Sequence, residues 1–124
     1  MQQTLISMIT NFEKITVELT ARELALIPSM IKAFSQYKKS NPIKAPQIVK
    51  KYNDNAKKGN IRLTQPRLRK IVNHIRSFGL LPIMATSNGY YVDFDKEEIK
   101  LQITSLQERA NSILNCAKGL ESFL

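Results

Sequence analysis

The middle of the 124-residue chain places apolar and polar residues at helical spacing. Four apolar residues fall at positions i, i+3, i+4 and i+7, namely Leu68, Ile71, Val72 and Ile75. This spacing predicts a helix with one buried stripe. Thr64 is a suitable N-cap and Pro66 suits a first turn. Because Gly79 then supplies a stop, we expect a helix over residues 65–78.

The other side of this predicted helix is basic and polar. It presents Arg69, Lys70, Asn73 and Ser77, which are flanked by Arg67, His74 and Arg76. Residues at these positions lie opposite or beside the apolar stripe. The outer side therefore offers cations and hydrogen-bonding groups, and by sequence it carries no acid.

A two-stranded hairpin is predicted directly after the helix. The segments LLPIMATS and YYVDF flank the pair Asn88 and Gly89. An Asn-Gly pair tolerates positive φ and is the strongest short-range signal for a hairpin. Tyr90 and Tyr91 then project from opposite faces of the second strand, so one is expected in the core and the other at the surface.

The segment 15–94 resembles a winged helix-turn-helix domain, because a helix is followed by a hairpin. The run RKIVNHIRSFGLLPIMATSNGYYVDFDKEE is similar to small winged-helix proteins encoded by bacteriophages and prophages. The resemblance implies a mainly α fold with a small β-hairpin (α+β), followed by a long C-terminal helix. It also implies a double-stranded DNA-binding protein whose recognition helix, residues 65–78, enters the major groove. Transcription regulation and initiation of DNA replication are the expected roles.

Helical periodicity also marks the start of the chain. Five apolar residues repeat at that spacing, namely Leu5, Met8, Ile9, Phe12 and Ile15. They predict a first helix over residues 4–14. Residues 15–19 favour either a short third strand beside the hairpin or an extension into the next helix, and the sequence leaves both open.

A second helical region is predicted to begin at Ala21. Thr20 and Glu23 form a capping-box pattern at its start. Its apolar stripe consists of Leu24, Ile27, Ile31 and Phe34. Pro28 lies inside this region, where proline removes a hydrogen bond and clashes with the preceding turn. We therefore expect a kink or two helical pieces.

A further helix is predicted for APQIVKKYNDN, residues 45–55, with Pro46 in its first turn. Residues 43 and 44 before it are expected to be extended. The segment NDNAKKGNI, residues 53–61, is polar and contains glycine, which predicts a surface loop. This loop is longer than the turn of the tightest helix-turn-helix motifs, so the angle between the two helices is left open.

The end of the chain carries a heptad pattern. Asp95, with Glu98 three residues on, marks the start of a helix that extends toward residue 124. Its apolar seam alternates steps of four and three through Ile99, Ile103, Leu106, Ala110, Ile113, Ala117, Leu120 and Leu124. A domain of this size does not cover a seam of that length. We therefore expect a homodimer through this helix, although packing against residues 4–14 stays open.

The net charge of +9 is unevenly distributed. Residues 24–92 hold thirteen Lys or Arg and one acid, Asp54, which gives +12, whereas residues 1–23 give −1 and residues 93–124 give −2. This is the electrostatic pattern of a surface that binds phosphates. The expected organisation is an N-terminal helix (1–14), a winged helix-turn-helix domain (15–94) and a C-terminal dimerisation helix (95–124).

Composition excludes several other functions. Cys116 is the only cysteine and His74 the only histidine, so neither an intrachain disulfide nor a zinc site is expected. No glycine-rich phosphate loop or cluster of catalytic residues is evident, so we expect no enzyme activity and no cofactor. No apolar run approaches the ~18 residues that cross a bilayer, and no signal peptide is evident. A cytoplasmic protein is expected.

If the chain binds DNA as the resemblance implies, side-chain chemistry suggests which part of the DNA each polar residue would contact. Arg69 and Lys70 suit guanine, Asn73 suits adenine, and Gln65 or Arg67 would reach a base or a phosphate. The same face includes His74, Arg76 and Ser77. Phosphate contacts are expected from Lys50, Lys51, Lys57, Lys58 and Arg62, and from Thr86, Ser87 and Asn88 at the hairpin tip.

Two other functions stay open. A non-catalytic adaptor would use the winged helix and the C-terminal helix to dock a partner protein. Binding of RNA or single-stranded DNA is a weaker option, because exposed tyrosines can stack on bases but aromatic residues are few. A stable dimer that binds DNA would favour the first function, and a monomer indifferent to DNA would favour the adaptor.

Overall fold

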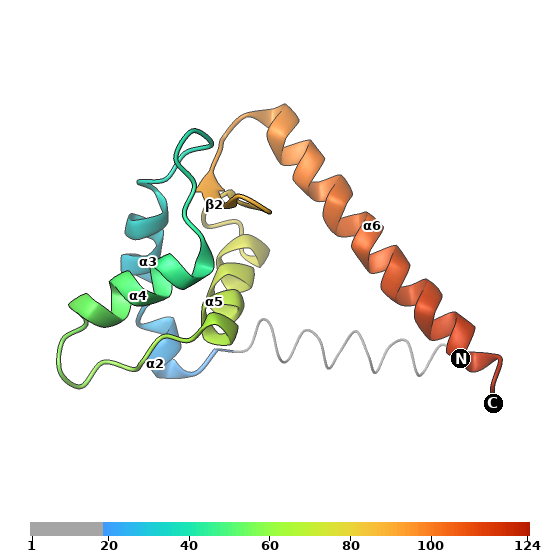
Figure 1. Ribbon diagram of the computed structural model, residues 1–124, viewed down its shortest axis with the longest axis horizontal. Helices are drawn as coiled ribbons and strands as arrows, with labels where there is room; N and C mark the ends of the chain where they lie inside the picture. Colours follow the sequence, from blue (N-terminus) through green and yellow to red (C-terminus); the bar gives the residue numbers. More distant parts are fainter. Residues whose placement is uncertain (1–18) are drawn as a thin grey trace.

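A computed structural model of the chain describes residues 19–124. This part contains five helices and one antiparallel hairpin, in the order α2 (Ala21–Leu24), α3 (Ile27–Phe34), α4 (Ala45–Asn55), α5 (Gln65–Ser77), β1 (Ile83–Thr86), β2 (Gly89–Val92) and α6 (Lys96–Glu121). Figure 1 shows the first helices and the hairpin packed together, with α6 leading away from them. The predicted mainly α fold with a small hairpin and a long C-terminal helix is confirmed. The helix expected over residues 4–14 lies outside the described residues, and so do residues 15–18, for which the sequence left a strand or a helical extension open.

The predicted break in the second helical region is confirmed. The side chains of Thr20 and Glu23 form the capping box, with Thr20 Oγ1 3.1 Å from Glu23 N and Glu23 Oε1 3.0 Å from Thr20 N. The region then divides into α2 and α3, and Pro28 lies in the first turn of α3. A first-turn proline removes no helical hydrogen bond, because its N–H would have had no partner there.

One residue of the predicted apolar stripe was placed wrongly. Leu24 is 45 % exposed, whereas Leu26 and Met30 are buried beside Ile27 and Phe34. The buried positions keep helical spacing from α2 into α3, but the buried stripe runs through Glu23 and not through Leu24. The apolar pattern alone missed this, because the buried residue in α2 is a carboxylate.

Helix α4 has the predicted bounds, but the polar segment after it begins later than expected. Residues 53–55, assigned to the loop as well as to the helix, form the last turn of α4. The Lys50 ammonium lies 2.6 Å from the Asp54 carboxylate, and Asn55 Nδ2 donates to the Lys51 carbonyl. Asn53 accepts from Leu63 N and donates to Leu63 O, both at 2.9 Å, so it ties the end of the loop to α4.

Helix α5 lies at the centre of the core. Thr64 caps it by accepting from Arg67 N at 3.3 Å, and Gly79 follows its end with a φ of +63°. The four residues of its predicted stripe are all buried. They pack with residues of α3, α4, the loop and the hairpin, namely Phe34, Ile43, Ile48, Leu63, Ile83 and Val92. This packing fixes which side of α5 faces outward.

The hairpin turn differs from the expected one. Thr86 pairs with Gly89, so Ser87 and Asn88 form the loop and only Gly89 has positive φ. The described sheet has two strands, and Ile43 adds an isolated bridge to β2, with its N–H and C=O paired with Tyr90 at 2.9 and 2.7 Å. Residues 43 and 44, expected to be extended, provide this bridge.

Gly89 is the position where the hairpin is least tolerant of a side chain. Its φ is +123°, and an added Cβ would lie 2.6 Å from the Ile43 carbonyl oxygen. We expect Gly89→Ala to lower the free energy of unfolding by about 2–3 kcal/mol, measured by urea denaturation. Gly119→Ala is the control, because nothing lies within 4 Å of that site in α6 and alanine favours a helix. Equal stability of the two variants would contradict this turn geometry.

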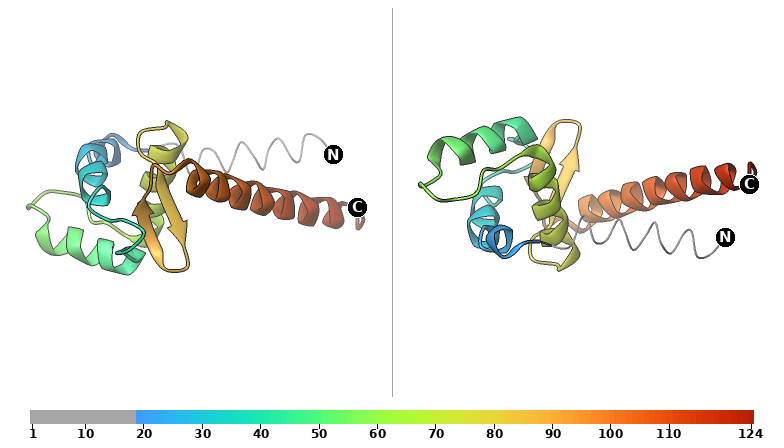
Figure 2. Two further views of the ribbon diagram at one scale, coloured as in Figure 1. Left: turned by 90° about the horizontal axis from the view of Figure 1, so that it is seen from above. Right: turned by 90° about the horizontal axis from the view of Figure 1, so that it is seen from below.

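The first turns of α6 are anchored to the hairpin. Asp95 caps the helix by accepting from Glu97 N, Glu98 pairs with Lys39, and Gln102 accepts from Ala85 N at 2.7 Å. The last contact covers the outer edge of β1, which would otherwise expose an unpaired N–H. Beyond these turns α6 extends away from the core, as the two views of Figure 2 show.

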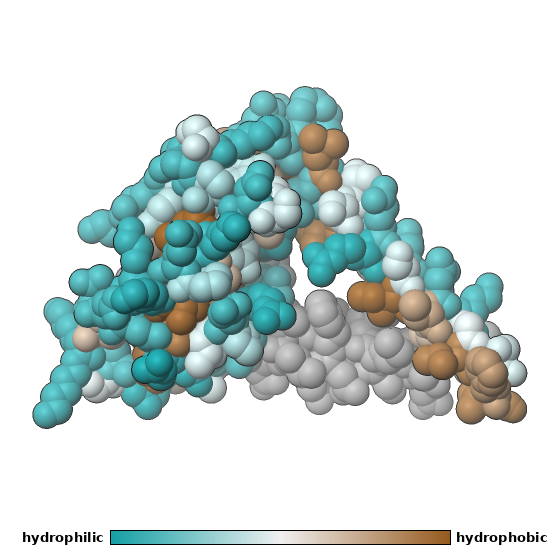
Figure 3. Space-filling model, in the orientation of Figure 1, coloured by the Kyte–Doolittle hydropathy of each residue, from teal (hydrophilic) through white to brown (hydrophobic). Residues whose placement is uncertain are grey.

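The apolar seam of α6 is poorly covered. No residue of α6 is buried, and the exposed fractions of Ile103, Leu106, Ile113 and Leu120 are 46, 41, 53 and 68 %. Ala110 and Leu124 are exposed too, while Ile99 and Ala117 are half-buried. Figure 3 shows apolar residues along one side of this helix. Despite its length, α6 is too polar to cross a membrane, and no other described helix is long and apolar enough to do so.

Candidate nucleic-acid interface

The outward side of α5 divides into two flanks that meet different neighbours. Arg67 and Lys70 lie toward α2, where both contact Glu23. Arg69 and Arg76 lie toward β2, where both interact electrostatically with Tyr90. The residues that the sequence grouped on one face therefore belong to two environments.

The first flank contains an acid that the sequence did not place there. Glu23 is 2 % exposed, and its two carboxylate oxygens lie 3.0 Å from Arg67 Nε and from Lys70 Nζ. Burial raises the pKa of Glu23, but hydrogen bonds from Thr20, Lys70 and Arg67 outweigh burial and leave a pKa of about 2. Glu23 is thus ionised at neutral pH and holds both cations.

Sequence reasoning recognised Glu23 only as part of a capping box. Its contacts with Arg67 and Lys70 span 44 and 47 residues of chain. No local spacing predicts such a contact, because it depends on how α2 packs against α5. Arg67 Nη1 also donates to the Arg62 carbonyl at 2.6 Å, which further fixes the Arg67 side chain.

Three residues lie between the two flanks, and Arg69 lies beside them at the edge of the second flank. Gln65, Arg69 and Ser77 are exposed, and Asn73 is half-buried. Within residues 19–124 these side chains make no hydrogen bond or ion pair with the protein, so their polar groups are free to meet a ligand. His74, half-buried, contacts the ring of Phe78 with the centroids 4.5 Å apart.

The second flank carries a desolvated cation. Arg76 is half-buried, its Nη2 atom is shielded from solvent, and no described group accepts a hydrogen bond from that atom. Burial lowers the pKa of Arg76 and raises the pKa of Tyr90. The Tyr90 ring also packs edge-on against Phe34, with centroids 5.6 Å apart, so Tyr90 joins the core to this flank.

Tyr90 and Tyr91 do not divide as one core and one surface residue. Tyr90 is half-buried, and Tyr91 is only 5 % exposed. Burial raises the pKa of Tyr91, and its hydroxyl lies 3.5 Å from a Glu98 carboxylate oxygen at the start of α6. Neither ring is fully open for stacking on a base.

The lysines of α4 are partly engaged. Lys50 pairs with Asp54, and Lys51 Nζ donates to the Tyr37 hydroxyl at 2.9 Å while lying 5.6 Å from the centre of its ring. Both lysines stay exposed. They can meet a second anion, but their positions are set by these contacts.

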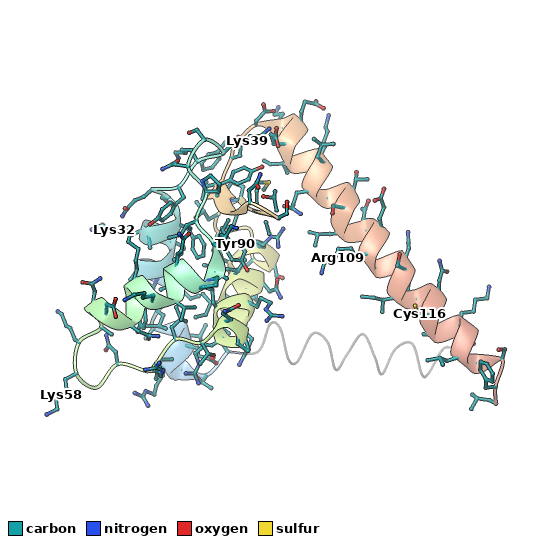
Figure 4. All side chains as sticks on the ribbon, viewed as in Figure 1. Lys32, Lys39, Lys58, Tyr90, Arg109 and Cys116 are labelled. Atoms are coloured by element: carbon teal, nitrogen blue, oxygen red, sulfur yellow. The ribbon has the colours of Figure 1, made fainter. Side chains whose placement is uncertain are left out.

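The loop between α4 and α5 carries three exposed cations that form no ion pair with a described carboxylate. They are Lys57, Lys58 and Arg62. Arg22 Nη2 donates to the Gly59 carbonyl at 2.9 Å and so holds the loop against α2. Figure 4 shows Lys58 at the outer end of this loop, far from α6.

The hairpin tip is polar and exposed. Thr86, Ser87 and Asn88 are all exposed, but the Thr86 hydroxyl already accepts from Asn88 N and donates to Gly89 O. A shallow pocket of about 270 Å³ lies beside the tip and is lined by Lys44, Ala45, Ala85, Thr86, Ser87, Gly89 and Tyr90. Lys44, at the start of α4, adds a cation that the sequence analysis did not select.

Acids are scarce around this basic surface. Between residues 24 and 92 the only acid is Asp54, which pairs with Lys50. The described residues include no cluster of His, Cys, Asp or Glu suited to a metal ion, and the exposed Cys116 lies apart on α6. The arrangement is therefore equipped to bind an anionic surface.

Comparisons with known proteins were made at three levels. Family models, curated protein sequences and solved structures were all searched with this chain, and none of the three searches finds a match.

Proposed function

We propose that this chain binds double-stranded DNA through α5 and acts as a homodimeric phage or prophage regulator of transcription or replication initiation, in the cytoplasm of a bacterial host. The observation that carries the proposal is the outward side of α5. Arg69, Asn73 and Ser77 lie there, and their side chains make no hydrogen bond or ion pair with another described residue. A core helix with such a face fits the width of the major groove.

Base recognition would rest on a short set of side chains. Arg69 can donate two hydrogen bonds to guanine, and Asn73 can exchange two with adenine. Gln65, in the first turn of α5, is exposed and within the same helical face. Lys70 is less available to contact a base than its position in the sequence suggests, because its ammonium is already paired with Glu23.

Phosphate contacts would come from the elements beside α5. Lys57, Lys58 and Arg62 lie on the loop that leads into α5, and the hairpin tip lies beside Lys44 at the start of α4. Contacts of this kind fix the register of a protein on the duplex without reading its sequence. The proposed interface is therefore α5 at the centre, flanked by the loop and the hairpin.

Selection from random duplexes tests the proposal. The full chain should retain a subset of duplexes that share a sequence, at two salt concentrations, because hydrogen bonds to base edges distinguish base pairs. Enrichment of a common site supports DNA recognition by this chain. Retention of no duplex even at low salt would contradict it.

A homodimer through α6 is the second part of the proposal. The seam residues Leu106 and Ile113 are 41 and 53 % exposed, so replacing both by glutamate should leave the fold intact while placing charges in a helix pair. We expect sedimentation to show a dimer for the wild-type chain and a monomer for this variant. Thr104→Glu with Asn111→Glu, one residue past two other seam positions, is the control and should remain dimeric. A monomeric wild type would contradict the dimer.

The exposed seam also favours one other function. A protein adaptor would cover the same residues of α6 with a different protein. This function predicts a monomer that binds neither duplex DNA nor a second copy of itself. The duplex selection and the sedimentation experiment together separate it from the DNA-binding proposal.

A further inference from the structure

The loop between α4 and α5, residues 56–64, is tied to the helices around it. Four of its backbone carbonyls accept a hydrogen bond from a side chain of α2, α4 or α5. The pairs are Arg22 with Gly59 at 2.9 Å, Tyr52 with Ile61 at 3.2 Å, Arg67 with Arg62 at 2.6 Å and Asn53 with Leu63 at 2.9 Å. These bonds restrict the backbone of the loop before any ligand binds.

The outer end of the loop is a tight turn that carries two lysines. Asn60 N donates to the Lys57 carbonyl at 3.1 Å, and Gly59 has a φ of +94°. A positive φ at the third residue of such a turn is the conformation that favours glycine. Lys57 and Lys58 are both exposed on this turn, and Figure 4 shows Lys58 at the edge of the molecule.

The same bonds determine which charges the loop offers to a ligand. A carbonyl oxygen is the negative end of the peptide dipole, so a free one repels an anion. The carbonyls of Gly59, Ile61 and Arg62 are engaged by side chains of the protein. The side chains of Lys57, Lys58 and Arg62 are exposed. The loop therefore offers cations to a ligand while these carbonyls are occupied.

We propose that Asn53 is a positioning residue that holds this loop as a preformed binding site for a phosphodiester backbone. Lys57, Lys58 and Arg62 make the phosphate contacts, and Asn53 touches no phosphate. Cations spread over residues 57–62 suit the repeated phosphates of a nucleic acid. Ordering a flexible loop on binding costs conformational entropy, and a loop that is already tied avoids this cost. The assignment to duplex DNA rests on the proposed function, because single-stranded nucleic acid has the same backbone chemistry.

Asn53 allows a test that leaves the net charge unchanged. Its amide donates to Leu63 O and accepts from Leu63 N, both at 2.9 Å. Asn53→Ala removes both bonds, and alanine is compatible with the last turn of α4. Asn55→Ala is the matched control, because Asn55 Nδ2 donates to the Lys51 carbonyl at 2.8 Å, within α4 and not to the loop.

Amide hydrogen exchange of the free chain tests whether the loop is preformed. The reporter is Asn60 N–H, which donates across the turn and makes no contact with Asn53. In Asn53→Ala this proton should exchange about tenfold faster than in the wild type, because two hydrogen bonds that hold the loop are lost. Asn55→Ala should match the wild type. Leu68 N–H, which donates within α5, should be unchanged in both variants.

Duplex titrations of the same chains test the effect on binding. Asn53→Ala should lower the affinity about tenfold, because ordering even one more backbone residue on binding corresponds to roughly that factor. Its slope of log affinity against log salt should equal the wild-type slope, since the same cations still displace the same counterions. Loss of a phosphate contact would instead reduce that slope by about one. Asn55→Ala should retain both wild-type values.

Tyr52→Phe is a second variant that leaves the charge unchanged. It removes only the hydroxyl that donates to Ile61 O, and it keeps the ring, which packs against the core. Both the exchange rate at Asn60 and the duplex affinity should change in the same direction as in Asn53→Ala. Exchange rates at Asn60 that are equal in the wild type and all three variants would overturn the preformed loop.

The outcomes distinguish the loop from the proposed function. Equal duplex affinities of Asn53→Ala and Asn55→Ala would overturn the positioning role and leave the proposed function standing. A wild-type chain that binds a single-stranded oligonucleotide but no duplex, with the loss in Asn53→Ala, would support the loop and contradict the proposed function. Binding to neither nucleic acid would overturn both.

Discussion

Arg69→Ala should lower the affinity for a selected duplex about tenfold, and Arg69→Ala with Asn73→Ala about a hundredfold. Each removed pair of base contacts is worth about 1–3 kcal/mol, and 1.4 kcal/mol is a factor of ten. Arg69 is exposed, so its removal should change the free energy of unfolding by less than about 0.5 kcal/mol. Fluorescence anisotropy at fixed salt measures the affinity, and circular dichroism checks the fold.

Lys32→Ala is the matched control for this experiment. Lys32 is an exposed cation on α3, so the substitution changes the net charge by the same amount as Arg69→Ala. Figure 4 shows it on the side of the core away from α6. The affinity of Lys32→Ala for the selected duplex should stay within about twofold of the wild-type affinity, since only a distant charge is lost. An equal loss in both variants would mean that net charge, and not the face of α5, determines binding.

Lys70 is left out of this series for a structural reason. Its ammonium lies 3.0 Å from a carboxylate oxygen of Glu23, a residue only 2 % exposed. Removing Lys70 would leave a buried carboxylate with one partner fewer and would destabilise the fold. A loss of binding in such a variant could not be assigned to a lost DNA contact.

Glu23→Gln should lower the free energy of unfolding at neutral pH by about 2–3 kcal/mol. The carboxylate has a pKa of about 2, lowered from 4.5, and a difference of that size corresponds to about 3 kcal/mol between the charged and neutral forms. Glutamine keeps the shape and can still accept from Thr20 N, but it loses the charge that pairs with Arg67 and Lys70. Urea denaturation at pH 7 measures the loss.

The same change should reduce the acid sensitivity of the chain. The pKa of Glu23 is lower in the folded state than in the unfolded state, so its contribution is complete above a pH of about 4.5 and is lost as the pH falls toward 2. Over that interval the wild type should lose stability faster than Glu23→Gln, and the two should converge near pH 2. Denaturation curves at several pH values measure both slopes.

Asp54→Asn is the control for Glu23→Gln. Its carboxylate, 58 % exposed, pairs with Lys50 one turn away on α4. Solvent-exposed pairs contribute little, so the free energy of unfolding should change by less than about 0.5 kcal/mol. A similar effect of the two substitutions would contradict the central position of Glu23 in the packing of α2 against α5.

The sequence predicted well those features that depend on neighbouring residues. The bounds of α4 and α5, the cap at Thr64 and the break at Pro28 all follow from short-range rules, because capping and proline geometry act within one turn. The buried stripe of α5 was also correct to the residue. These features give the fold class and the outward side of α5.

Features that depend on packing between distant segments were not predictable. The contact of Glu23 with Arg67 joins residues 44 positions apart, and the environment of Arg76 combines α5, β2 and α6. The pairing of Ile43 with Tyr90 brings a backbone carbonyl against Gly89, a close approach that no pattern within the hairpin indicates. The sequence therefore located the cations of the candidate surface on α5, but not which of them are already held by the protein.

The dependence of duplex affinity on salt tests the central claim most directly. Three exposed cations, those of Lys57, Lys58 and Arg62, are proposed to lie against phosphates, and releasing counterions from about three phosphates predicts a log-log slope of about −3. The measurement is an anisotropy titration of the full chain with a selected duplex at several salt concentrations between about 50 and 200 mM. The account predicts tight binding at the lowest salt and a steep, linear fall. Absence of binding at low salt, or an affinity independent of salt, would contradict it.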